Sequence, residues 1–215
     1  MATTARENIL SKIKQALKKS VPVPFPASEG NTSVFQPSVQ ELEIAFAENF
    51  TKLQGRFSYC SNEAELAAQL QTLATQRKWE NIYCVESELK TTLSNNGFEN
   101  HTATALASCD ASVTYCEQLV ARTGSLLLSS GQASGRTVSV YAPVHICIAY
   151  TDQLVYDIAD GIDSLLDKYR LNLPSLISLA SCPSRTADIE KTLVVGVHGP
   201  KEVFCFLLDR QEAIV

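Results

Sequence analysis

Two spacings of apolar residues predict the helices and strands of this chain. Apolar side chains recur every three or four positions in five segments, which predicts amphipathic helices over about 1–19, 38–54, 61–77, 87–96 and 153–169. Short apolar runs rich in β-branched and aromatic residues predict strands near 56–60, 81–85, 111–114, 125–130, 144–150, 175–180, 193–197 and 203–208. Because strands alternate with helices, we predict an α/β fold in which a layered parallel or mixed sheet has helices on both faces.

The first 37 residues differ in pattern from the rest. The N-terminal helix carries Ile9, Ile13 and Leu17 on one face and lysines largely elsewhere, which indicates a packing arm with a solvated basic face; a membrane-surface helix is the alternative. Four of the eight prolines follow it before Ser38, as in an extended linker. Ser38 and Glu41 fit a capping box that opens the next helix. We therefore predict an N-terminal helix and Pro-rich linker over 1–37 and a single α/β domain over 38–215.

Composition excludes several classes of protein. The 215 residues are 45% hydrophobic and 19% charged, so the chain is not dominated by disorder. A net charge of −5 argues against a nucleic-acid-binding surface, and no run of 18 apolar residues predicts a membrane span. The seven cysteines form no C-x-x-C pair, so we expect neither a disulfide framework nor a metal or iron–sulfur site, and we expect a cytoplasmic location.

Polar residues with a shared chemical use gather at the ends of the predicted strands in the second half. They are Thr123, Gly124, Ser125, Arg136, Ser184, Arg185, Thr186 and His198. Small residues offer backbone N–H groups to an anion, and arginine offers a planar fork that matches a carboxylate or phosphate. We predict one pocket for a small organic or phosphorylated anion. Arg185 is its main anion-binding side chain, Arg136 is second, and the Thr-Gly-Ser backbone lies opposite.

Each of these segments also has a structural interpretation. Thr-Gly-Ser fits an ordinary turn, and the SRTADIE segment fits a helix N-terminus capped by Ser184 or Thr186. Arg185 would then pair with Asp188 or Glu190 on the following turn. His198 would donate to a loop carbonyl, and His145 would be core or pocket rim. The fingerprints of dinucleotide-binding proteins, P-loop proteins and serine hydrolases are missing from the sequence.

Three segments carry a family resemblance: LASCDASVTYCEQLVARTGSLLLSS, APVHICIAY and SCPSRTADIEKTLVVGVHGPKEVFCFLLD. Over residues 38–209 the chain resembles the lactate utilization protein C family, whose shared unit is the LUD domain. PSRTADIE followed by VVGVHGP is the most specific mark. The resemblance implies the layered fold of ribose-5-phosphate isomerase, glucosamine-6-phosphate deaminase and the CoA transferases. It also implies a role in oxidising L-lactate to pyruvate with two iron–sulfur proteins, which would hold the clusters while this chain holds no cofactor.

The chain departs from the family pattern at two positions. Arg122 stands where an acidic residue usually precedes Thr-Gly-Ser, and Cys182 stands where a glycine is common. The resemblance leaves the catalytic residues unassigned, with Asp188, Glu190 and His198 as candidates. Two other functions stay open: an independent enzyme on a phosphorylated or CoA-linked anion, with Asp188 or Glu190 as the carboxylate nucleophile, and a non-catalytic anion-binding or scaffold protein. Whether the chain forms a homodimer is open too.

Overall fold

The chain divides into two units, Met1–Gln36 and Pro37–Val215. The computed structural model describes residues 5–18, 40–101, 105–187 and 193–210. In the first unit, helix α1 (Ala5–Leu17) is present where the apolar spacing predicts it, and none of its residues is buried. No helix among the described residues has both the length and the apolar character needed to cross a membrane.

The second unit is built on a parallel sheet. Its five strands, in the described part of the chain, lie in the order β1 (Arg56–Cys60), β11 (Glu202–Leu208), β6 (Val144–Tyr150), β3 (Ala111–Tyr115) and β2 (Ile82–Tyr83). Every neighbouring pair in this sheet is parallel. The final strand β11 therefore lies between β1, the first strand of the chain, and β6.

A second, smaller sheet stacks on the large one. Its strands lie in the order β7 (Leu154–Val155), β4 (Gln118–Val120), β5 (Ser125–Ser129) and β8 (Ile177–Ala180). β5 is antiparallel to both β4 and β8, whereas β4 and β7 are parallel. A separate hairpin pairs β9 (Arg185–Ala187) with β10 (Leu193–Val195).

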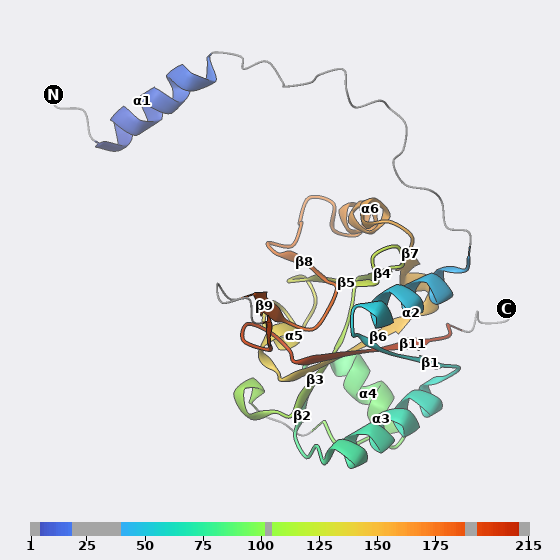
Figure 1. The fold of residues 1–215 in the computed structure, drawn as a ribbon. Helices are drawn as coiled ribbons and strands as arrows, with labels where there is room; N and C mark the ends of the chain where they lie inside the picture. Colours follow the sequence, from blue (N-terminus) through green and yellow to red (C-terminus); the bar gives the residue numbers. More distant parts are fainter. Residues whose placement is uncertain (1–4, 19–39, 102–104, 188–192, 211–215) are drawn as a thin grey trace. The chain divides into compact units, whose positions relative to one another are not determined.

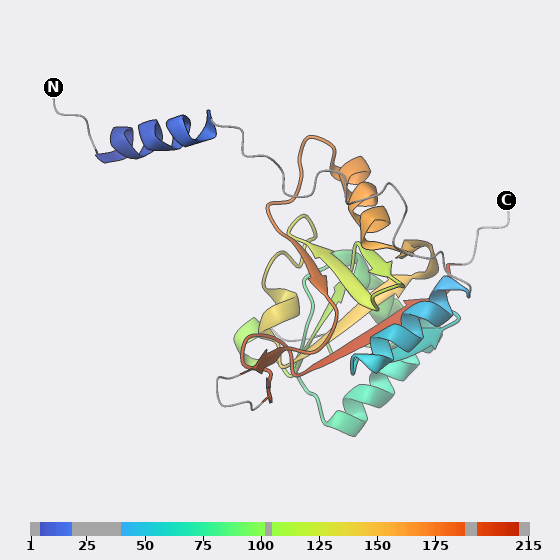
Figure 2. The same cartoon turned by 45° about the horizontal axis from the view of Figure 1, so that its top comes forward.

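Both faces of the inner strands β3, β6 and β11 are buried, which explains why these strands are predominantly apolar. On one face, α3 (Glu63–Arg77) and α4 (Ser87–Asn95) pack on Ile146, Phe204 and Phe206 (Figure 1). On the other face, α2 (Leu42–Lys52) and the small sheet pack on Cys147, Cys205 and Leu207. Figure 2 shows α2 lying along β11 and β1. Two further helices, α5 (Val138–Tyr141) and α6 (Ile158–Tyr169), complete the domain.

The predicted fold class is confirmed, but several local predictions were wrong. Helix α2 begins at Leu42, later than predicted, with Glu41 as its N-cap and without a side-chain capping bond; Ser38, the predicted cap, lies outside the described residues. The helix predicted from about 153 begins only at Ile158, because Thr151–Gln153 form a 3-10 turn and Leu154–Val155 pair with β4. The helix N-terminus considered for SRTADIE is instead strand β9 at Arg185–Ala187.

Removing residues 1–35 should leave a folded domain. No residue of α1 is buried, and the large sheet, the small sheet and both core clusters are formed by residues beyond Gln36. We expect the truncated chain to melt in one cooperative transition, followed by circular dichroism. An insoluble or non-cooperatively melting product would mean that the N-terminal segment contributes to the core or bridges two copies of the chain.

Candidate functional site

Four of the predicted site residues meet in one cleft of about 530 Å³: Ser184, Arg185, Thr186 and His198. We call it the serine cleft because three more serines line it, Ser139, Ser178 and Ser181. It lies where β8 ends, as the sequence predicts, but β8 belongs to the small sheet. The cleft is therefore at the amino ends of β6 and β11 in the large sheet, where His145, Pro200 and Val203 contribute to its wall.

His145 is the buried polar group of this wall. Its side chain is 1% exposed, and its Nε2 lies 2.9 Å from the Thr114 hydroxyl, which is itself 2.8 Å from the Tyr115 carbonyl oxygen. If that hydroxyl donates to the carbonyl, Nε2 is the donor to Thr114 and Nδ1 is the bare nitrogen of a neutral ring. Burial lowers the pKa of His145 to about 4, so the ring is uncharged at neutral pH. The interpretations of core residue and pocket rim are both correct for this histidine.

The two loops that form the cleft are tied to each other. The Ser184 N–H donates to the Pro200 carbonyl at 2.8 Å, and the Gly196 N–H donates to the Ser184 carbonyl at 3.0 Å. Arg185 is exposed, and its Nη2 donates to the Leu53 carbonyl at the end of α2 at 3.2 Å. One guanidinium donor is thus anchored on backbone, and this bond fixes the side chain beside the cleft.

The Thr123-Gly124-Ser125 turn lies behind the cleft rather than in its lining. The Ser125 hydroxyl is 2.7 Å from the Ser181 hydroxyl and 2.8 Å from that of Thr123, so the turn reaches the cleft through Ser181. Gly124 is buried against α2, where an added Cβ would lie 2.3 Å from the Phe50 backbone nitrogen. Its backbone packs on a helix, which leaves little space for a ligand on that side.

Arg136 is not part of the serine cleft. Arg136 is exposed, hydrogen-bonds the Ser175 hydroxyl and is outside the lining of the serine cleft. Asp188 and Glu190 lie outside the described residues, so the structure gives them no position.

Ser139, Ser178 and Ser181 were missed by sequence reasoning. No motif marks them, since Ser139 belongs to α5 whereas Ser178 and Ser181 belong to β8 and the segment after it, and only the fold brings these segments to one cleft.

Arg122, the first departure from the family pattern, points away from the cleft. Its Nε and Nη2 donate to the two Asp157 carboxylate oxygens at 2.9 and 3.0 Å. The guanidinium holds the pKa of Asp157, the N-cap of α6, below its ordinary value. The charge reversal at this position therefore builds a structural ion pair between the Thr-Gly-Ser turn and α6.

The charge of the serine cleft favours an anion. Its described lining contains Arg185, the neutral His145, the exposed His198, four serine hydroxyls and Thr186, but no aspartate or glutamate. Hydroxyl and guanidinium groups hydrogen-bond carboxylates well, and without a carboxylate in the wall nothing in it repels one. Among the described residues, no group of three or more His, Cys, Asp and Glu side chains is placed to hold a metal ion.

Cys182, the second departure, lines the serine cleft and is the one cysteine of seven that is not buried. We expect iodoacetamide to modify one thiol of the native protein quickly and all seven in denaturant, as counted by mass spectrometry. The buried thiols react only through local opening and should be slower by about two orders of magnitude or more. Fast labelling that persists in Cys182→Ser would contradict this prediction. Labelling of Cys182 then reports on occupation of the cleft.

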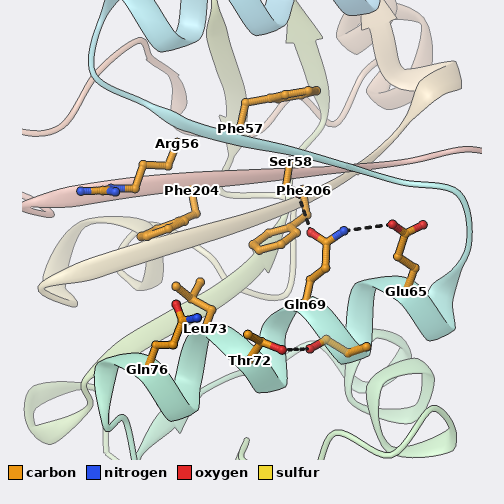
Figure 3. Close-up of a pocket in the computed structure, with 11 residues that line it drawn as sticks. Arg56, Phe57, Ser58, Glu65, Gln69, Thr72, Leu73, Gln76, Phe204 and Phe206 are labelled. Carbon is orange, nitrogen blue, oxygen red and sulfur yellow. Dashed lines mark hydrogen bonds between the residues drawn. The ribbon is translucent and has the colours of Figure 1, made fainter.

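Another hollow, of about 460 Å³, lies between β1 and α3 (Figure 3). Phe204 and Phe206 face Leu73 across it, and Gln69 lies between Ser58 and Glu65, to which it is hydrogen-bonded. Its cation, Arg56, pairs with Glu202 at 2.9 Å. None of the predicted site residues lies here, and Arg56, Ser58, Glu65, Gln69 and Thr72 already have partners, so we assign it no chemistry.

The fold and the cleft define a class of protein. It is an α/β protein whose parallel sheet is covered by helices on one face and by a helix and a small mixed sheet on the other, with a hydroxyl-lined cleft between the ends of the two sheets. The chain belongs to the LUD domain family, whose model matches residues 44–208.

Relatives and one solved structure agree with this assignment. Lactate utilization protein C of Geobacillus sp. (strain WCH70) is 36% identical over 102 residues, 46% of this chain and 42% of that protein. Lactate utilization protein C of Halalkalibacterium halodurans is 39% identical over 93 residues, 42% of this chain and 40% of that protein. The matches thus span about two fifths of the length of these relatives. The crystal structure of a DUF162 family protein from Deinococcus radiodurans has a similar fold, with a TM-score of 0.56, 19% identity, and coverage of 78% of this chain and 96% of that one.

Proposed function

We propose that this protein is a cytoplasmic component of L-lactate utilisation, acting with two iron–sulfur proteins in the oxidation of L-lactate to pyruvate. The observation that carries this proposal is the serine cleft, in which Arg185 and five hydroxyl side chains meet without an acidic residue in the described lining. The family assignment and the names of the relatives support the same process. Oxidation of lactate releases two electrons and two protons, and in this proposal the electrons pass to the partners' clusters.

Within this proposal the chain holds the substrate. The Arg185 guanidinium keeps donors beyond the one anchored on Leu53, and these form a two-point contact with the lactate carboxylate. Ser184 and Thr186 flank Arg185 and supply hydroxyl donors to the same group. The neutral His145 in the wall adds a hydrogen-bonding nitrogen without adding charge.

The proposal is tested by purifying the tagged full chain from lactate-grown cells. We expect two iron-containing proteins to co-purify and the complex to reduce an artificial electron acceptor when L-lactate is added. The chain purified alone should be colourless and inactive. Co-purification of a phosphorylated or CoA-linked anion, with no lactate-dependent activity, would contradict the proposal and favour an independent enzyme.

Arg185→Lys is expected to keep the melting temperature and to weaken L-lactate binding by about 1–3 kcal/mol, the scale of a lost charge-assisted hydrogen bond. The measurement is the concentration of L-lactate that protects Cys182 from iodoacetamide. Arg136→Lys is the matched control, because Arg136 does not line the serine cleft. A lower melting temperature with unchanged protection would mean that Arg185 only ties β9 to the end of α2.

A further inference from the structure

A second cleft, of about 570 Å³, lies at the opposite edge of the large sheet. Tyr115 ends β3, Tyr150 ends β6, and Arg210 follows β11; all three line it. We call it the carboxyl-edge cleft. It shares no lining residue with the serine cleft. The carboxyl ends of parallel strands are where α/β sheets characteristically place ligands.

One cation of this cleft is held in place by a buried carboxylate. Lys168 Nζ lies 2.7 Å from Oε2 of Glu117, whose side chain is 2% exposed. The other Glu117 oxygen accepts bonds from the hydroxyls of Tyr169 at 2.7 Å and Ser129 at 2.5 Å. Burial alone would raise the pKa of Glu117, but these donors together lower it, so the carboxylate stays charged. One N–H donor of the Lys168 ammonium group is therefore held by Glu117, while the Lys168 side chain remains 60% exposed.

A second cation reaches the cleft from another element. Arg210 pairs with Asp152, and its guanidinium lies over the Tyr150 ring, 4.9 Å from the ring centroid. Tyr150 in turn contacts Tyr115, with 6.1 Å between the ring centroids. The aromatic pair thus supports the Arg210 guanidinium from below. This guanidinium has five N–H donors, more than its contact with Asp152 uses.

Acidic and amide groups share the same cleft. Glu86 is 6% exposed and accepts the Tyr115 N–H at 2.7 Å, and burial raises the pKa of its carboxyl group. Glu88 is exposed at the start of α4, and Gln132 comes from the loop after β5. Lys168 and Arg210 are each already paired with a carboxylate, Glu117 and Asp152, and Glu86 and Glu88 line the cleft as well, so the cleft has no excess of positive charge. A bare anion therefore gains little here, in contrast to the serine cleft.

We propose that the carboxyl-edge cleft binds a hydroxylated organic anion, with the anionic group between Lys168 and Arg210 and the hydroxyl groups on Glu86, Glu88 and Gln132. Carboxylate and amide oxygens accept bonds from ligand hydroxyls, while the two cations hold the charged end. The cationic and the hydrogen-bond-accepting side chains come from different elements. This arrangement matches a ligand that carries its charged group at one end and its hydroxyl groups at the other. A hydroxy acid and a sugar-type phosphate both have this chemistry.

Isothermal titration calorimetry on the full chain distinguishes these sources. The probes are D-gluconate, as a polyhydroxy carboxylate, and glycerol 3-phosphate, as a hydroxylated phosphate. Acetate and inorganic phosphate carry the charge without hydroxyls, and glycerol carries hydroxyls without the charge. We expect at least one of the first two probes to bind about tenfold or more tightly than all three controls.

Variants locate the binding. Arg210→Gln should weaken the probe about tenfold, and Lys168→Gln should do so too. Arg210→Gln is the decisive variant, because Lys168→Gln leaves the buried Glu117 without its cation and lowers stability. Lys52→Gln, which removes an exposed lysine paired only with Glu48, is the matched control and should leave binding unchanged.

Two results would overturn the proposal. One is that neither probe binds more tightly than acetate, phosphate or glycerol. The other is that Arg210→Gln binds the probe as the unmodified chain does. The proposed function fails separately, because L-lactate in the serine cleft is detected through Arg185→Lys and protection of Cys182, neither of which involves Lys168 or Arg210.

Discussion

Replacing Gly124 by alanine is expected to lower the free energy of unfolding by about 3 kcal/mol or more, because the added methyl group meets backbone that has no room to move. The Cβ would lie 2.3 Å from the Phe50 nitrogen and 2.5 Å from the Asn49 carbonyl carbon. Phe50 is fully buried, and the Asn49 side chain donates to the carbonyls of Ala121 at 2.9 Å and Arg122 at 3.3 Å. The turn and α2 are thus clamped together on both sides of the clash.

The variant Gly135→Ala distinguishes the energetic cost of this steric clash from the cost of backbone strain. Gly135 has a φ of 64°, close to the 58° of Gly124, but an added Cβ at Gly135 meets nothing within 4 Å. Strain from the left-handed conformation alone costs about 1–2 kcal/mol, so urea denaturation should show the smaller loss for Gly135→Ala. Equal losses in the two variants would show that α2 and the turn adjust to the methyl group.

The second large effect is a dependence of stability on pH that comes from His145. Its pKa is about 4 in the folded protein and 6.5 in the reference state, so between these values the unfolded chain binds a proton that the folded chain does not. Stability is therefore intact above pH 6.5 and falls as the pH decreases towards 4. The full loss is about 3 kcal/mol, from roughly 1.4 kcal/mol per pKa unit.

His145→Gln should remove this contribution, because glutamine stays neutral and its amide can still hydrogen-bond Thr114. The measurement is urea denaturation at several values between pH 4 and 7.5, comparing slopes rather than absolute stabilities, since carboxylates contribute to both proteins alike. His198→Gln, which removes an exposed histidine, is the matched control. Parallel curves for His145→Gln and the unmodified chain would contradict a buried, neutral His145.

Apolar spacing was enough to predict the fold class, because the strands of the large sheet lie in predominantly apolar runs, such as VHICIAY for β6 and EVFCFLL for β11. It failed for β4, β7 and β9, which have two or three residues each, too few to show a period. The pairing of these short strands determines the course of the second half of the chain through the two sheets. A strand that joins the small mixed sheet ends at a different edge of the domain from one that joins the parallel sheet.

The residues of the serine cleft were predicted only in part, again because the sequence does not show how the short strands pair. Ser184, Arg185 and Thr186 are adjacent in sequence and all three line the cleft, and His198 joins them because the pairing of β9 with β10 brings the segment after β10 back to it. Arg136 was grouped with them from its place after a strand, yet it lies beside Ser175. The carboxyl-edge cleft had no motif at all, since its residues come from six separate segments and each is ordinary in its own context.

The position of β11 has a consequence for how the chain matures during synthesis. β1 has β11 as its neighbour in the large sheet, yet 141 residues separate the end of β1 at Cys60 from the start of β11 at Glu202, counting from residue 61 to 201. On the ribosome, β1 therefore has its backbone donors and acceptors unpaired until β11 has emerged. Pairing across so long a separation is slow and leaves an exposed strand edge open to aggregation. Nascent chains of this protein are accordingly expected to depend on chaperones, and premature termination before Glu202 to yield a product marked for degradation.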